Sequence, residues 1–133
     1  MKALHSDVFR RSVVVMVGEL DDAMRRAFMA ELRGRADAGT IRKAWDKVVA
    51  ACRETWEECR YQGVTAHVDG DVYIHLPKWL SPVFVHEAYH AMRYVMKDID
   101  AKDEEVSALV IEWIFEEICL GDRRPGPMKE KTR

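Results

Sequence analysis

The sequence predicts an α+β fold with about three strands packed against four helices. Apolar residues that recur every three or four positions predict four helices, over 21–34, 40–63, 81–97 and 101–120. A β-branched run predicts an inner strand over 12–17. Alternating apolar and polar residues on either side of Asp69-Gly70-Asp71 predict two more strands, 64–68 and 72–76.

Length and charge narrow the classes of protein to which the chain can belong. With 133 residues we expect one domain over 1–121, followed by a basic, disordered tail over 122–133. The net charge of −2 gives no overall basic field that would attract nucleic acid or an anionic membrane surface. No apolar run is long enough to span a membrane and no signal-peptide core is present, so we expect a cytoplasmic protein.

The three cysteines do not form a recognisable framework. Cys52 and Cys59 are seven residues apart on a helical pattern, and Cys119 is far away in the sequence. Neither a disulfide set nor a zinc knuckle has this spacing, so buried free thiols are expected.

The first half of the chain reads as a strand followed by two helices. Residues 1–10 have no clear period and are expected to run over the surface. Asp21 and Asp22 open the first helix, because acidic side chains suit a helix start. Thr40 is the expected cap of the second helix, whose buried stripe should include Trp45, Trp56 and both helical cysteines.

The register of the hairpin can be argued from its two faces. A two-residue Asp69-Gly70 loop would pair Val68 with Asp71 and mix apolar with polar residues on each face. A three-residue loop pairs Val68 with Val72, which leaves one polar face carrying Thr65, His67, Tyr73 and His75. We therefore expect the three-residue loop, with both histidines facing solvent or a substrate.

The third predicted helix carries the motif His-Glu-x-x-His. Ser81 is the expected cap, and Val85, Ala88, Tyr89, Met92, Val95 and Met96 form an apolar stripe. His86 and His90 are four residues apart, so each can place a ring nitrogen on one metal ion. Glu87 can then reach a metal-activated water. In the alternative interpretation, all three are merely solvated helix residues.

A catalytic zinc site needs a third protein ligand. A third histidine six residues after His90 is absent, because Met96 stands there, so a carboxylate is expected. We favour Glu105 over Glu104, because Ala108 one turn later would let the two helices approach closely. Glu112 either orients one of the histidines or is a surface charge.

These residues resemble the gluzincin arrangement, in which His-Glu-x-x-His is followed by Glu-x-x-Ala. The likeness is in particular to small metallopeptidase-like proteins encoded in bacteriophages and prophages, and it covers about 35 residues around the motif. It implies a small zincin-like domain with Zn²⁺ held by His86, His90 and Glu105, and with Glu87 as catalytic base. Leu109 departs from the family pattern, because many gluzincins have Asp there.

The expected function is therefore zinc-dependent hydrolysis of a protein or peptide substrate. The oxyanion would be stabilised by one of four candidates, His67, Tyr73, His75 or Tyr94. The alternatives are a zincin-fold binding or regulatory protein without turnover, and a helical interaction module in which the motif is accidental. The sequence sets neither the substrate nor the oligomeric state.

Overall fold

The computed structural model describes residues 1–6, 11–98 and 104–115. It has four strands and four helices in these ranges: β1 (Lys2–Ser6), β2 (Arg11–Val17), α1 (Asp22–Glu31), α2 (Ala38–Glu58), β3 (Val64–Val68), β4 (Asp71–Leu76), α3 (Ser81–Asp98) and α4 (Glu104–Phe115). The predicted α+β class, the four helices and the three predicted strands are confirmed. Residues 2–6 were expected to be irregular but form a fourth strand, so that expectation is wrong.

The strands form one mixed sheet in the order β1-β2-β4-β3. β2 and β4 are parallel neighbours at its centre, whereas β1 and β3 are antiparallel edge strands. The predicted inner position of β2 is therefore correct. A strand between two neighbours can be buried on both faces, which explains its unbroken β-branched run.

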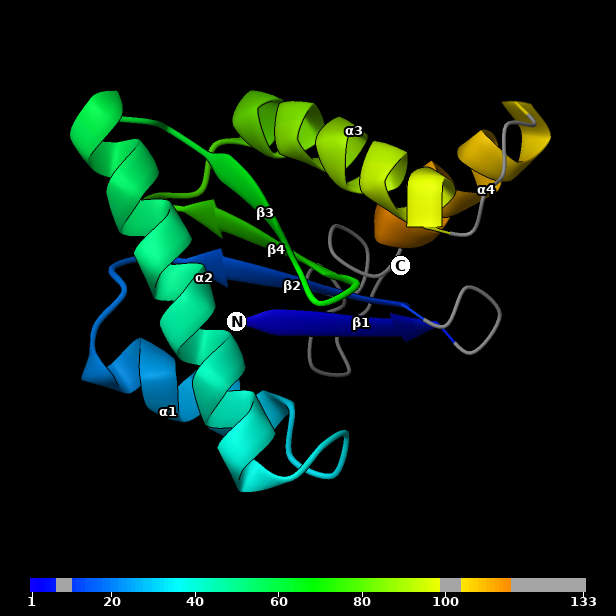
Figure 1. The fold of residues 1–133 in the computed structure, drawn as a ribbon. Helices are drawn as coiled ribbons and strands as arrows, with labels where there is room; N and C mark the ends of the chain where they lie inside the picture. Colours follow the sequence, from blue (N-terminus) through cyan, green and yellow to red (C-terminus); the bar gives the residue numbers. More distant parts are fainter. Residues whose placement is uncertain (7–10, 99–103, 116–133) are drawn as a thin grey trace, which may run out of the picture.

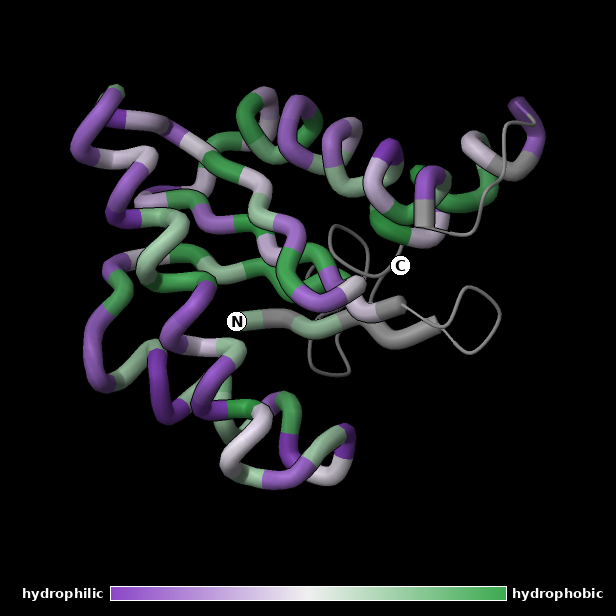
Figure 2. Tube along the Cα trace, viewed as in Figure 1, coloured by the Kyte–Doolittle hydropathy of each residue, from purple (hydrophilic) through white to green (hydrophobic). Residues whose placement is uncertain are grey.

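Helices cover both faces of the sheet (Figure 1). On one face, Val13, Val15, Val72, Ile74 and Leu76 pack against α3 and α4. On the other, the alternate residues Val14, Met16 and Tyr73 pack against α1 and α2, with Phe28 and Trp45 at the centre. Figure 2 shows the same layering, with hydrophobic residues concentrated along the central strands.

The hairpin between β3 and β4 has the register that the sequence argument rejected. Val68 pairs with Asp71 and Ala66 with Tyr73. Asp69 and Gly70 have φ values of 51° and 87°, as in the two-residue type I′ turn that suits the twist of a hairpin. A register that mixes apolar and polar residues on each face is unfavourable when one face of the hairpin is exposed to solvent. Here helices cover both faces of the sheet, so this register buries apolar side chains on both sides. Thr65 and His67 consequently lie on the α3 side, while Tyr73 and His75 lie on the α2 side.

Two details of the first two helices also differ from expectation. Asp37, not Thr40, caps α2: its carboxylate accepts hydrogen bonds from the backbone N–H and hydroxyl of Thr40, both at 2.9 Å. These bonds lower the pKa of Asp37. Trp56 and Cys59 are exposed, so Cys52 is the only buried thiol among the described residues.

The second pair of helices buries a narrower stripe than predicted. Ala88, Met92, Val95 and Met96 are buried on α3 as expected, but Val85 and Tyr89 are about half exposed. On α4, Val110 and Ile114 are buried while Leu109 is exposed. The predicted end of this helix, Cys119 and the tail over 122–133 lie outside the described residues. No helix in the described ranges is long and apolar enough to cross a membrane.

Candidate functional site

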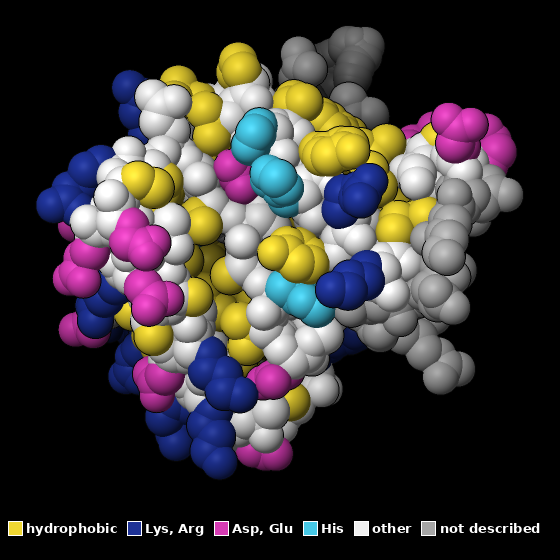
Figure 3. Space-filling model, turned by 45° about the horizontal axis from the view of Figure 1, so that its top comes forward, with side chains coloured by type: hydrophobic (Ala, Val, Ile, Leu, Met, Phe, Trp, Pro, Cys, Tyr) yellow, Lys and Arg dark blue, Asp and Glu magenta, His cyan; other side chains and the backbone are white. Residues whose placement is uncertain are grey.

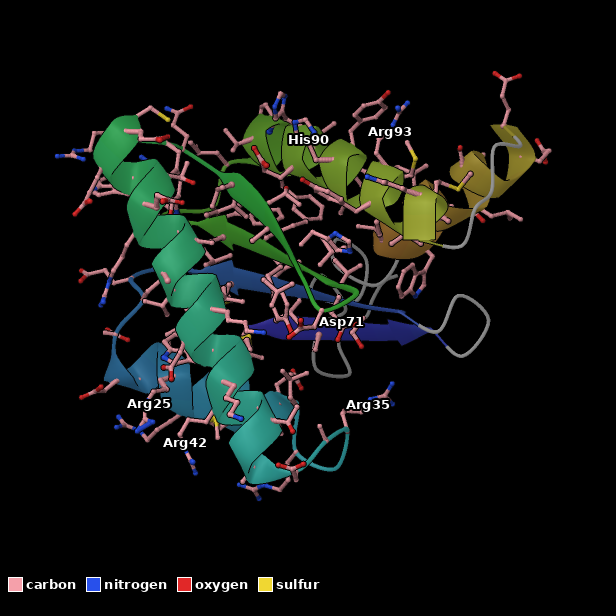
Figure 4. All side chains as sticks on the ribbon, viewed as in Figure 1. Arg25, Arg35, Arg42, Asp71, His90 and Arg93 are labelled. Carbon is pink, nitrogen blue, oxygen red and sulfur yellow. The ribbon has the colours of Figure 1, made fainter. Side chains whose placement is uncertain are left out.

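The two histidines of the motif lie together on the outer side of α3. Both are exposed, and His86 Nε2 lies 3.2 Å from His90 Nε2. Their ring centroids are 4.8 Å apart. Figure 4 shows His90 on the side of α3 that faces away from the sheet, and Figure 3 shows two histidine side chains adjoining at the surface. The helical spacing predicted from the sequence therefore brings these two side chains together.

The separation of the two nitrogens fits a shared metal ion. Two nitrogen ligands about 2.0–2.1 Å from a tetrahedral zinc are about 3.3–3.4 Å apart. In this structure the contact is a hydrogen bond in which one neutral imidazole donates its Nε2 proton to the other. The pair is thus already close to the geometry that zinc requires.

Glu87 is buried between α3 and the edge strand β3. It is only 6% exposed, so the alternative interpretation of Glu87 as a solvated charge is wrong. The Thr65 hydroxyl lies 2.6 Å from Glu87 Oε1 and 3.1 Å from the Glu87 backbone oxygen. The other carboxylate oxygen, Oε2, lies 4.0 Å from His86 Nε2. The carboxylate is therefore held by the strand at one oxygen while its second oxygen faces the histidine pair.

Gly63 permits this close approach. A Cβ atom at position 63 would lie 2.6 Å from Val83 Cγ1 and 3.0 Å from Glu87 Cγ, both shorter than normal contacts. The sequence pattern marks Gly63 only as the end of the predicted helix over 40–63 and Thr65 only as a residue of the predicted hairpin. Neither role could be found without knowing that β3 crosses α3 here.

The four candidate oxyanion donors separate into two pairs. His67 and Tyr94 stack on the α3 side, with ring centroids 4.7 Å apart and planes 25° apart. Tyr94 is one turn after His90, so this pair continues the same surface. Tyr73 and His75 lie buried on the opposite face of the sheet. The sheet separates them from the histidine pair, so they cannot act there.

Glu105 is not brought to the histidine pair in this structure. No group of three potential metal-ligating side chains occurs among the described residues. Val110 and Ile114 mark the buried side of α4, and Glu105 lies about 160° from that side at 100° per residue. Glu105 and Glu112 are both exposed. Ala108, which we expected at the helix contact, is exposed as well, whereas Ser107 is partly buried.

The length of α3 explains this separation. The helix continues for eight residues beyond His90 and ends at Asp98. At 1.5 Å per residue, its end lies about 12 Å along the axis from His90. The first turn of α4, which carries Glu104 and Glu105, follows after only five more residues. Whether Glu105 binds zinc therefore stays a prediction.

A second polar network lies on the α2 side of the sheet. His75 Nε2 is 2.7 Å from the Gly18 carbonyl oxygen, and His75 Nδ1 is 2.7 Å from the Tyr61 hydroxyl. Because a carbonyl only accepts, Nε2 carries the proton and Nδ1 accepts from Tyr61. The thiol of Cys52 lies near the Tyr61 hydroxyl, and burial raises the pKa of this thiol to about 11. The expectation that His75 faces solvent is thus wrong.

We predict that Thr65→Val lowers the free energy of unfolding by about 1–3 kcal/mol, because it leaves the buried Glu87 carboxylate without its hydroxyl donor. Thr65→Ser keeps that donor and should retain most of the stability. Urea unfolding of the two variants beside the wild type checks this. Equal destabilisation by Ser and Val would mean that packing, not the hydrogen bond, matters at position 65.

The network around His75 predicts a pH dependence of stability. Burial lowers the pKa of His75 below its ordinary 6.5, although the bond to the Gly18 carbonyl acts in the opposite direction. Unfolded His75 takes up a proton near pH 6.5, while the folded form resists protonation. The contribution of neutral His75 to the free energy of unfolding is therefore fully present above about pH 6.5. It declines as the pH falls toward the lower pKa that His75 has in the folded protein. Urea midpoints across this range should fall more steeply for the wild type than for His75→Gln.

Comparisons with known proteins found no match: no family model, no curated protein and no solved structure is similar to this chain.

Proposed function

We propose that the protein is a zinc-dependent metallopeptidase, a small zincin-like enzyme that hydrolyses peptide bonds. The observation that carries the proposal is the 3.2 Å separation of His86 Nε2 and His90 Nε2 beside a buried carboxylate. An accidental His-Glu-x-x-His would not be expected to bury Glu87 and to supply it with a dedicated hydroxyl donor. Catalytic acids and bases are commonly held by such surrounding hydrogen bonds.

His86 and His90 would hold the metal through their Nε2 atoms. A bound zinc ion supplies a Lewis acid that polarises a carbonyl and activates water at neutral pH. Glu87 is the general base, and Oε2, which faces His86, receives the proton from the attacking water. The Thr65 hydroxyl keeps Oε1 occupied, so only one carboxylate oxygen is left to accept that proton. The Tyr94 hydroxyl is the oxyanion donor that the geometry favours.

Glu105 remains our proposed third ligand, with Glu104 as the alternative. Either choice requires the first turn of α4 to lie closer to His90 than it does in this structure. The separation of Glu105 from the histidine pair also favours the second function, a zincin-fold binding protein without turnover. Two exposed histidines alone hold zinc more weakly than three ligands do. The two functions make different predictions for zinc content and for hydrolysis.

We predict that the purified wild type binds one zinc ion, and that His90→Ala and Glu105→Gln each lower its zinc content. Changing a residue that only orients a metal ligand typically lowers metal affinity by about 10–100-fold. Removing a ligand itself should therefore lower zinc affinity by more than about tenfold. Zinc titration monitored by calorimetry measures this. Glu104→Gln is the matched control, because it removes an equal charge from the same turn, and its zinc affinity should be unchanged. Loss of zinc in Glu104→Gln alone would reassign the third ligand.

We predict that Glu87→Gln abolishes peptide hydrolysis while zinc remains bound, because the amide cannot accept a proton but can still accept the Thr65 hydrogen bond. Mass spectrometry of a mixed peptide library incubated with zinc-loaded wild type and variant measures this. Zinc binding with no cleavage by the wild type would favour the binding protein. No zinc binding at all would contradict both functions.

A further inference from the structure

Four side chains of α3 form one straight strip. His86, His90, Arg93 and Lys97 lie within about 60° of one another around the helix axis at 100° per residue. All four are exposed. Figure 4 shows His90 and Arg93 on the same outer side of α3, and Figure 3 shows Lys and Arg side chains beside the exposed histidines. The histidine pair therefore continues directly into a cationic strip.

The two cations of this strip are Arg93 and Lys97. Neither Arg93 nor Lys97 forms an ion pair with any residue that the structure describes. Figure 3 shows an acidic side chain beside the adjoining histidines, where Glu87 Oε2 lies 4.0 Å from His86 Nε2, and the Lys and Arg side chains on the other side of them. Tyr94 and His67, stacked beside the strip, add a flat aromatic floor without negative charge. Among the residues that the structure describes, Arg93 and Lys97 thus carry positive charge without an ion-pair partner next to the candidate site, in a protein whose net charge is −2.

We propose that this strip binds an acidic peptide segment and makes Arg93 and Lys97 determinants of substrate specificity. The identification of that segment as a substrate rests on the proposed peptidase function. Along the axis, Arg93 is about 4.5 Å and Lys97 about 10.5 Å beyond His90. An extended peptide advances about 3.3 Å per residue, so a peptide cleaved at the histidine pair places residues about one to three positions from the scissile bond beside these cations. Asp or Glu at those positions complements the strip.

The test measures binding without turnover, in full-length Glu87→Gln protein loaded with zinc. The probes are a fluorescein-labelled peptide of alternating Glu and Ala and its isostere with Gln in place of every Glu. Fluorescence anisotropy at low salt should give tighter binding of the acidic peptide. Arg93→Gln with Lys97→Gln should reduce that preference about fivefold or more, since each exposed ion pair contributes modestly.

The matched control is Arg25→Gln with Arg42→Gln, which removes the same charge from exposed arginines of α1 and α2 on the opposite layer (Figure 4). This pair should keep the preference for the acidic peptide. Equal binding of the two peptides to the unsubstituted strip, or an equal loss in the control pair, would overturn the proposal. Acidic-peptide binding through Arg93 and Lys97 in a protein that cleaves nothing would support the acidic-peptide site, but it would remove the peptidase function and with it the role of the two cations in substrate specificity. Cleavage of peptides with no preference for acidic residues would support the peptidase function and overturn the proposal for Arg93 and Lys97.

Discussion

The close approach of α3 to the start of β3 is the constraint on which the candidate site depends. Ala88 and Ala91 are completely buried on the sheet side of the helix, and Gly63 has no side chain where the strand meets it. Small residues let the two backbones approach until Thr65 reaches the carboxylate of Glu87. Once Glu87 points into this contact, the helical period turns His86 and His90 outward to solvent. The buried Glu87 carboxylate and the exposed histidine pair are therefore two consequences of one packing arrangement.

An exposed histidine pair makes an open, shallow site. His86 has 67% of its side chain accessible, so a peptide can reach the pair without entering a deep cleft. If the pair binds zinc as proposed, it supplies only two ligands and solvent competes for the metal. The affinity for zinc would then depend on where the first turn of α4 lies relative to α3. The eight residues of helix beyond His90 set that distance, and they also carry the cations of the strip.

The histidines of the two sheet faces show how burial divides similar residues into different roles. His67 and His75 are on neighbouring strands and read alike in the sequence. His67 lies on the α3 side and stacks with Tyr94, whereas His75 is enclosed with both ring nitrogens hydrogen-bonded. A histidine satisfied in this way stabilises the junction of β2, β4 and the segment after α2. It has no free ring nitrogen with which to hold a metal.

Local pattern alone determined the α+β class, the four helices, the central strands and the spacing that joins His86 to His90, because each depends on periodicity within one element. Tertiary structure decided the hairpin register, since only the presence of helices on both faces makes mixed faces favourable. It also decided the burial of Glu87, its bond to Thr65 and the separation of Glu105 from the histidines. These features depend on how far one helix or strand extends past its neighbour. The spacing of apolar residues within one element carries no information about that distance.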